Sequence, residues 1–192
     1  MKSTLDPSPL LEVSKRSEWR AWLRRHHKTS KQIWLVFYKK HTGRPRVAYN
    51  DAVEEALAFG WIDSTAVKVD EDRYAQRFTP RRTGSSYSPS NVARLRSMAA
   101  RGKIIPEVLA KVEPLLVEKP PVIPPDILAA LKEDRETWKN FRAFSDSYKR
   151  IRIGYIDGAR DRPLEFAKRL RNFLKVTKAN RIIGFGGIQK HY

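Results

Sequence analysis

The spacing of hydrophobic residues near the start of the chain predicts an amphipathic helix followed by a buried strand. Trp19, Trp22, Leu23 and His26 recur at i, i+3, i+4 and i+7, which places them on one helix face, and Ser17 is a suitable N-cap. The next segment, QIWLVFYKK, is a run of β-branched and aromatic residues with almost no polar interruption. Such a run is typical of a strand that is buried on both faces.

Two shorter patterns follow. The turn sequence HTGRP leads into VAY, which we expect to form a short partner strand. NDAVEEALAFG then has the composition of a compact helix, with Asn50 as its cap, acidic residues near its positive end and Gly60 as its stop. The first part of the chain is therefore expected to mix helices with strands.

The segment WIDSTAVKVDEDRYAQRF predicts a hairpin that turns at positions 70–72. In its second strand two sets of residues alternate, with Tyr74, Gln76 and Phe78 on one face and Arg73, Ala75 and Arg77 on the other. A helix is expected to follow in SPSNVARLRSMAARGK, with Ser88 as N-cap, Pro89 at its first position and Gly102 as its stop.

The proline-rich segment EKPPVIPP marks a change in pattern. It excludes a helix or a central strand and predicts a stiff linker, and hydrophobic residues beyond it recur at helical spacing. We predict an α+β fold: a small antiparallel sheet with flanking helices, followed by a C-terminal helical segment. The expected boundaries are 1–118 for the α+β module, 119–125 for the linker, 126–178 for the helical segment and 179–192 for an irregular tail.

The composition narrows the classes of function. The 192-residue chain carries a formal net charge of +18 at pH 7 and contains no cysteine and four histidines. This composition excludes disulfides and cysteine nucleophiles, and no metal-ligand spacing or cofactor motif is present. The N-terminus lacks the apolar core of a signal peptide, and no apolar run approaches the ~20 residues of a membrane helix. We therefore expect a cytoplasmic protein with no membrane span, no metal, no cofactor and an anionic partner.

The positive charge is concentrated around RFTPRRTGSSYSPSN. From Arg73 to Lys103 the chain has eight basic residues and no acidic one. Like charges at this density cost free energy unless carboxylates, salt or an anionic ligand offset them. A small ligand that bears phosphate or carboxylate would suit the arginine side chains, the hydroxyls and the amino end of the predicted helix. Aromatic rings could pack against the rest of such a ligand. The candidate ligand-binding residues are Trp61, Asp63, Arg77, Phe78, Arg81, Arg82, Ser85, Tyr87 and Asn91.

Two alternatives to ligand binding would also account for these charges. The arginines can pair internally with Asp63, Glu54 or Glu55, while the serines cap turns. Alternatively, the chain binds nucleic acid non-specifically, with Arg94, Arg101 and Lys103 contacting phosphates. No motif assigns catalytic residues, so the sequence leaves open whether the protein is an enzyme.

The block that contains ALAFGWIDS and FTPRR, together with the C-terminal ILAALKEDRETWKNFRAFSDSYKRIRIGYIDGAR, resembles the YdeI/OmpD-associated (bacteriocin-protection) family over roughly residues 15–175. The resemblance implies a bacterial, cytosolic protein that acts in stress resistance, in protection against bacteriocins or antimicrobial peptides. It brings no assigned catalytic residues. Because a strongly cationic protein repels cationic peptides, we expect any such protection to be indirect.

Overall fold

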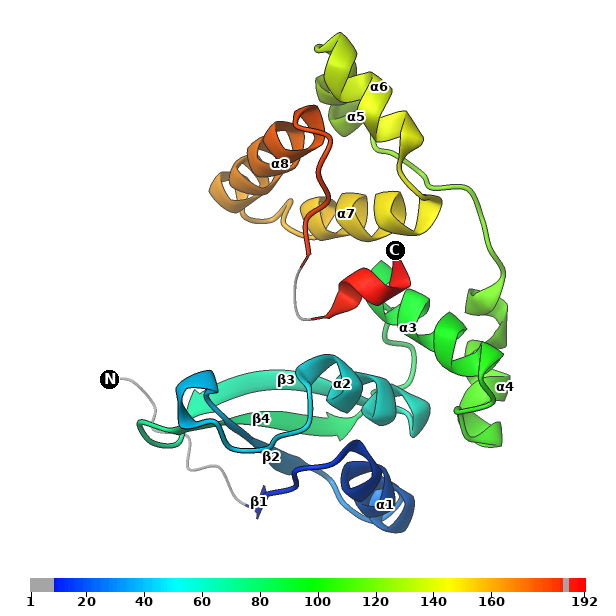
Figure 1. Ribbon diagram of the computed structural model, residues 1–192. Coiled ribbons are helices and arrows are strands. Elements are labelled where there is room, and N and C mark those ends of the chain that lie inside the picture. Colours follow the sequence, from blue (N-terminus) through cyan, green and yellow to red (C-terminus); the bar gives the residue numbers. More distant parts are fainter. Residues whose placement is uncertain (1–8, 185–186) are drawn as a thin grey trace. The chain divides into compact units, whose positions relative to one another are not determined.

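The computed structural model describes residues 9–184 and 187–192, and the chain divides into two compact units (Figure 1). Unit 1 comprises Met1–Ser86 and Met98–Pro114, and unit 2 comprises Tyr87–Ser97 and Leu115–Tyr192. The division falls within two helices, α3 (Pro89–Ala100) and α4 (Pro106–Leu116).

Unit 1 is built on a four-stranded sheet in the order β1-β2-β4-β3. Its strands are β1 (Leu10–Leu11), β2 (Ile33–Tyr38), β3 (Trp61–Lys68) and β4 (Arg73–Pro80). β4 pairs antiparallel with both β2 and β3, whereas the short edge strand β1 pairs parallel with β2. The predicted α+β fold is confirmed, and β3 and β4 form the predicted hairpin.

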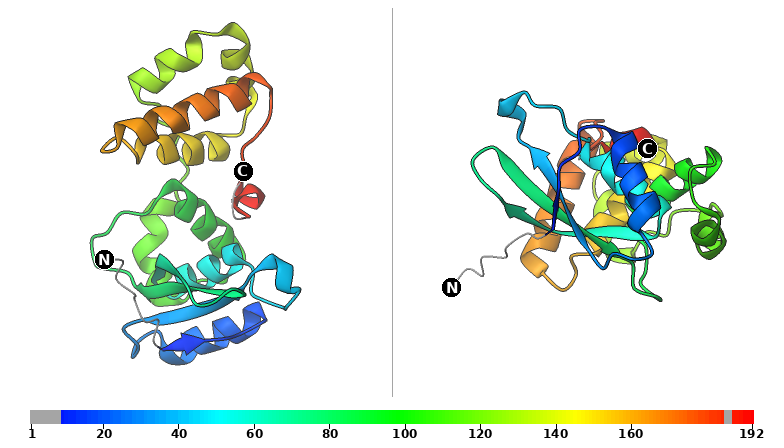
Figure 2. Two further views of the ribbon diagram at one scale, coloured as in Figure 1. Left: turned by 90° about the vertical axis from the view of Figure 1, so that its left-hand side faces the viewer. Right: turned by 90° about the horizontal axis from the view of Figure 1, so that it is seen from below.

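Two helices, α1 (Arg16–His26) and α2 (Tyr49–Ala58), cover one face of this sheet (Figure 1, Figure 2). The ring of Trp19 in α1 lies 5.3 Å from the ring of Phe78 in β4, measured between centroids. The indole N–H of Trp19 also donates to the backbone carbonyl of Ala52 in α2, at 3.0 Å. A single buried side chain therefore ties α1 both to the sheet and to α2.

Alternation within β4 decides which side chains enter this core. Phe78 is fully buried on the face that α1 covers, so its neighbour Arg77 points to the opposite face. The strand register places Phe78 opposite Ile33 on one side and Asp63 on the other, and it places Arg77 opposite Trp34. Asp63 therefore shares the helix-covered face with Phe78, whereas Arg77 shares the other face with Trp34.

Buried carboxylates join α1 to α2. Glu54 and Glu55 are 0% and 3% exposed. Arg16 lies 2.9 Å from Glu54 and 2.6 Å from Glu55, and Arg20 lies 2.6 Å from Glu55. Burial lowers the pKa of Arg16, but its hydrogen bond to Glu55 and the surrounding acidic charges outweigh burial and raise that pKa. The ion pairs compensate the desolvation of two carboxylates inside the unit.

Replacing one of these carboxylates should destabilise unit 1. We expect Glu55→Gln to lower the free energy of unfolding by about 2–3 kcal/mol, less than a fully buried pair costs, because Arg16 and Arg20 are partly exposed and water can replace part of the interaction. Urea unfolding followed by tryptophan fluorescence measures this, since Trp19, Trp22, Trp34 and Trp61 lie in unit 1.

The matched control is Glu107→Gln, which removes the same charge from an exposed pair with Lys28. We expect this control to change the free energy of unfolding by less than about 1 kcal/mol. Equal effects of the two substitutions would contradict a structural role for the buried network.

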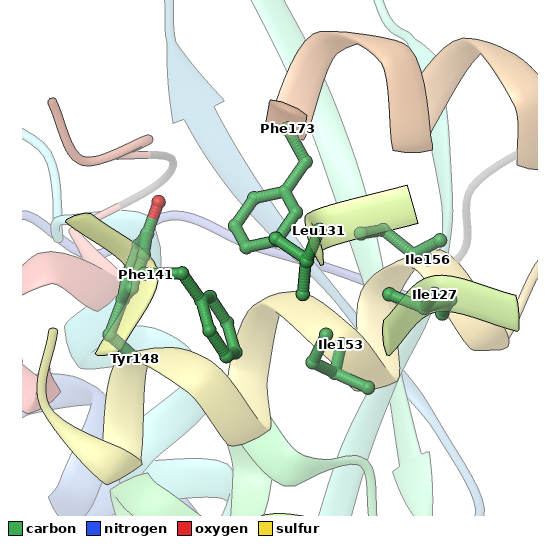
Figure 3. Packing of buried hydrophobic residues seen from close by; sticks show 7 residues of the cluster. All are labelled: Ile127, Leu131, Phe141, Tyr148, Ile153, Ile156 and Phe173. Carbon is green, nitrogen blue, oxygen red and sulfur yellow. The ribbon is translucent and has the colours of Figure 1, made fainter. Parts of the chain in front are cut away.

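Four helices make up most of unit 2: α5 (Pro125–Lys132), α6 (Arg135–Ala143), α7 (Asp146–Asp157) and α8 (Pro163–Lys178). Each of them contributes side chains to one hydrophobic cluster (Figure 3). The ring of Phe173 in α8 meets that of Phe141 in α6 edge-on, with centroids 6.2 Å apart. The helical spacing read from the sequence therefore identifies residues that pack together, and the predicted C-terminal helices are confirmed.

A glycine and the C-terminal tail complete the packing of unit 2. A Cβ atom at Gly154 in α7 would lie 2.5 Å from Cγ of Pro89 in α3, so the close approach requires a residue without a side chain. Ile188–His191 form a 3-10 helix, η2, in which Ile188 is buried and packs with Ala93. The tail predicted as irregular at 179–192 is thus partly ordered, and its residues 185–186 lie outside the described residues.

Three local predictions are wrong. VAY does not form a strand, because Tyr49 already begins α2. Asn50 lies inside α2 rather than capping it, and its side-chain amide donates to Glu54 at 2.6 Å. α1 begins one residue before Ser17, where the carboxylate of Glu18 accepts the backbone N–H groups of the two residues that precede the helix.

The connecting segments follow the predictions more closely. The predicted HTGRP turn contains one turn of 3-10 helix, η1 (Lys40–Thr42), and residues 118–124 have no regular secondary structure. α4 continues through Pro114 and ends two positions beyond that proline. Among the described helices, none combines the length and the apolar character needed to cross a membrane.

Asp134 fixes the start of α6. Its carboxylate accepts hydrogen bonds from the backbone N–H and the hydroxyl of Thr137, both at 2.8 Å, and it lies 2.8 Å from the ammonium group of Lys178. The hydrogen bond from Lys178, followed by those from Thr137, lowers the pKa of Asp134 well below the usual value of about 3.9.

This lowered pKa predicts how acid affects unit 2. A carboxyl group whose pKa is lower in the folded than in the unfolded chain stabilises the fold above about pH 4, and that stabilisation is lost as the pH falls further. We expect Asp134→Asn to be less stable than the natural chain at neutral pH, with a difference that shrinks from about pH 4 downward. Urea unfolding by circular dichroism at a series of pH values measures it, and a difference that stays constant into strong acid contradicts the assignment.

Candidate functional site

A hollow of about 700 Å³ lies on the face of the unit 1 sheet opposite to the one that α1 and α2 cover. Ile62 of β3 is paired with Thr79 of β4 in its floor, and Arg77 shares the face of Thr79. None of the residues that line it is acidic. We call it the sheet hollow, and its lining residues are Lys31, Ile62, Ser64, Arg77, Thr79, Pro80, Arg81, Arg82, Ser85 and Ser86.

The loop at residues 81–86, which is closed by its own hydrogen bonds, forms one wall of the sheet hollow. The backbone N–H of Ser85 donates to the carbonyl of Arg82 at 3.2 Å, and Gly84 between them has φ +78°. This is the geometry of a type II turn, which requires a positive φ at its third residue. The guanidinium of Arg81 donates to the carbonyl and hydroxyl of Ser85 at 3.2 and 3.1 Å, and to the carbonyl of Ser86 at 2.7 Å. Arg81 therefore holds the loop in place.

Arg77 differs from Arg81 in its surroundings. It is half-buried, and its Nε atom is buried without a hydrogen-bond partner in the described part of the chain. The acidic residue nearest to it in the β3–β4 ladder, Asp63, lies on the opposite face and accepts a hydrogen bond from the hydroxyl of Tyr49 at 2.6 Å. A buried donor without a partner is costly, so Arg77 has an unmet capacity to bind an anion.

The other cationic and hydroxyl groups that line the sheet hollow are also available to a ligand. Lys31 and Arg82 are exposed, and within the described residues their side chains form no ion pair. The hydroxyls of Ser64, Thr79 and Ser86 likewise lack a hydrogen-bond partner there. Cationic and hydroxyl donors together suit phosphate or carboxylate oxygens.

Two parts of the chain match different family models. Residues 11–111 match the model of a domain of unknown function, DUF8412, which is more than half of the chain. The chain belongs to the DUF8412 family. Residues 120–180 match the model described as bacteriocin-protection, YdeI or OmpD-associated. The searches of curated proteins and of solved structures gave no match.

The two matches refine the resemblance seen in the sequence. The likeness to the YdeI/OmpD-associated family is confirmed for residues 120–180, which include α5 to α8. ALAFGWIDS and FTPRR, which suggested that likeness most strongly, lie instead in the part that matches DUF8412. The sheet hollow extends from Lys31 to Ser86 and is therefore wholly contained in the DUF8412 domain.

The structure separates the nine residues predicted for the site. Arg77, Arg81, Arg82 and Ser85 line the sheet hollow in the DUF8412 domain. The others do not: Trp61, Phe78 and Asp63 face α1 and α2, and Tyr87 and Asn91 belong to unit 2.

Strand alternation explains why Phe78 and Arg77 lie on opposite faces of the sheet. Trp61 and Phe78 were expected to wall the ligand, but they are 1% and 0% exposed and pack in the core. The indole N–H of Trp61 is already bound to the carbonyl of His27, at 3.0 Å. Because neighbouring side chains of a strand point to opposite faces, Phe78 cannot line the hollow that Arg77 lines.

Tyr87 and Asn91, the two other predicted site residues, lie in unit 2. At the amino end of α3, the backbone N–H of Asn91 donates to the hydroxyl of Ser88 at 3.3 Å, as expected for an N-cap. The side chain of Asn91 accepts a hydrogen bond from Arg94 at 3.0 Å. The role of Tyr87 and Asn91 in anion binding stays a prediction.

Internal pairing accounts for some of the clustered arginines and not for others. Arg73 pairs with Glu12 and Asp70, and Arg101 lies 3.7 Å from Glu54. Glu54 and Glu55 pair mainly with arginines of α1, and no ion pair to Asp63 is present among the described residues. Arg77 and Arg82 have no such partner within the described part of the chain, so internal pairing does not explain them.

The residues expected to contact nucleic acid differ in their surroundings. Arg94 is 7% exposed and bound to Asn91, Arg101 is held near Glu54, and only Lys103 is exposed without an ion pair in the described structure. Arg94 belongs to unit 2 and the other two belong to unit 1. No observation favours the nucleic-acid alternative.

Several lining residues were missed in the sequence. Ile62, Ser64 and Thr79 could have been found by following the alternation of the hairpin from Arg77. Lys31 carried no such signal, because it reaches the hollow only through the pairing of β2 with β4. Across the described residues, no group of three or more histidine, aspartate or glutamate side chains could hold a metal ion.

The loop contacts predict a specific effect of Arg81→Lys. All three acceptors in Ser85 and Ser86 are contacted by one guanidinium nitrogen of Arg81, Nη2. The rigid guanidinium plane fixes the position of that nitrogen, whereas a lysine ammonium sits on a shorter and more flexible side chain, so the turn should open more often. We expect the backbone amide of Ser85 to exchange hydrogen for deuterium about tenfold faster, with little change in global stability. Arg82→Lys in the same loop serves as control and should leave exchange unchanged. Equal exchange in both variants contradicts the role of Arg81.

Proposed function

We propose that the DUF8412 domain binds a small anionic ligand, bearing phosphate or carboxylate, in the sheet hollow. The observation that supports this most directly is a lining with four cationic side chains and no acidic one. Charges of one sign that converge on a hollow raise its potential, and a ligand of opposite sign relieves their mutual repulsion. The lining hydroxyls of Ser64, Thr79 and Ser86 add donors that have no partner within the described residues.

The proposed biological role is a part in stress resistance or in protection against bacteriocins and related peptides. The description of the family matched at residues 120–180 supports the part of this role that concerns bacteriocins. A net charge of +18 argues against direct capture of cationic peptides, because the two would repel each other. We therefore propose that ligand binding in the DUF8412 domain contributes to protection indirectly.

A thermal-shift screen of phosphorylated and carboxylated metabolites tests the binding proposal. A ligand present at ~100 times its Kd should stabilise the domain by about 2.7 kcal/mol and raise its melting temperature. Arg82→Ala should reduce this rise, because it removes from the rim of the hollow a cation that forms no ion pair among the described residues.

The matched control for the screen is Arg24→Ala, which removes the same charge from an exposed position on α1. The control should keep the full rise in melting temperature. If no anion raises the melting temperature, or if both variants lose the rise equally, the proposed site is wrong.

A further inference from the structure

The cationic residues of the sheet hollow have unequal roles. Arg81 uses its guanidinium to bind the loop at Ser85 and Ser86, and it is therefore committed to the protein. Arg77 has a buried Nε with no partner in the described part of the chain. The residue best prepared to receive an anion is thus the one in the floor of the hollow, not the one in its wall.

The position of Arg77 strengthens this distinction. β4 is hydrogen-bonded on both sides, to β2 and to β3, so the backbone that carries Arg77 is held more firmly than a loop. Partial burial removes competing water and makes a hydrogen bond from its guanidinium to an anion stronger than at the surface. The planar guanidinium can also donate two parallel hydrogen bonds, which match a phosphate group.

The charge of the hollow indicates the charge of the ligand. Lys31, Arg77 and Arg82 all lack a carboxylate partner among the described residues. A carboxylate with a single charge leaves most of their repulsion in place, whereas a phosphate monoester carries about −1.5 to −2 at pH 7. The lining therefore favours phosphate over a single carboxylate.

The size of the hollow indicates that the ligand has an organic body. Its volume of about 700 Å³ lies within the range of roughly 300–1,000 Å³ that is typical of sites for organic ligands. Ile62 and Pro80 provide apolar surface beside the cations. A free inorganic anion would leave this surface and most of the volume without contacts.

We propose that the sheet hollow is a site for an organic phosphate ester whose phosphate is bound by Arg77, with Arg81 acting only as a positioning residue for the loop. This rests on the proposed function and makes it more specific. Lys31 and Arg82 meet the phosphate at the rim, and the hydroxyls of Thr79 and Ser64 donate to its remaining oxygens.

Isothermal titration calorimetry of the full chain with matched probes tests the ligand class. The pairs are glucose 6-phosphate with gluconate, glycerol 3-phosphate with glycerate, and AMP with adenosine, and inorganic phosphate is titrated alone. We expect at least one ester to bind about tenfold or more tightly than its partner and than inorganic phosphate. Tenfold corresponds to about 1.4 kcal/mol, a modest value for the extra negative charge that each ester carries over its partner near several cations.

Variants of Arg77 test whether this residue binds the phosphate group. Arg77→Lys keeps the charge but loses the paired hydrogen bonds, so we expect about tenfold weaker binding of the ester, and Arg77→Ala should weaken it further. The unliganded Arg77→Lys variant should be as stable as the natural chain, because the Nε that it removes has no partner among the described residues. Arg24→Ala is again the control for charge and should change the Kd less than about twofold.

The outcomes separate this inference from the proposed function. If a carboxylate binds as tightly as its matched ester, or if Arg77→Lys and Arg77→Ala bind the ester like the natural chain, the inference is overturned and the proposed function stands. A loss of stability in unliganded Arg77→Lys also overturns it, because Arg77 would then serve the fold. If no probe of either class binds, both proposals fail.

Discussion

The two-residue repeat of side chains along β4 is the constraint on which the rest of unit 1 depends. Phe78 must enter the core under α1, so Arg77 must point to the other face. Burying a side chain of this size contributes roughly 2–3 kcal/mol, and a slip of one residue would expose Phe78 and bury a charge. The same packing that stabilises the sheet therefore places an arginine on the floor of the sheet hollow.

The sequence allowed the fold to be predicted better than the candidate site. Hydrophobic periodicity predicted the hairpin, the buried strand β2 and the C-terminal helices, because each of these patterns reflects a local repeat. It did not predict that β2 pairs with β4, since strand pairing depends on contacts between distant segments. Lys31 was missed for that reason. Trp61 and Phe78 were grouped with the arginines because closeness in sequence was taken as closeness in space, whereas the structure buries both side chains in the core.

The high net charge has more than one physical basis. Some arginines are structural: Arg16 and Arg20 neutralise the buried carboxylates of α2, and Arg81 organises a loop. Others, such as Arg77 and Arg82, have no such role among the described contacts. Counting charges along the chain could not separate the two kinds, because the distinction depends on which carboxylates and carbonyls the fold brings near each guanidinium. The same distinction between structural arginines and those that have no such role among the described contacts shows why a basic composition by itself does not indicate nucleic-acid binding.

The turn at Gly84 has a consequence for the rate at which molecules enter and leave the sheet hollow. Because the loop is closed by its own hydrogen bonds, its backbone has little freedom left to lose when the hollow is filled. Ligand entry then needs no slow rearrangement of this loop. The lifetime of a complex is set by how strongly the residues in the floor of the hollow bind the ligand. For a ligand of the proposed class, differences in affinity would then appear mainly in the rate of dissociation.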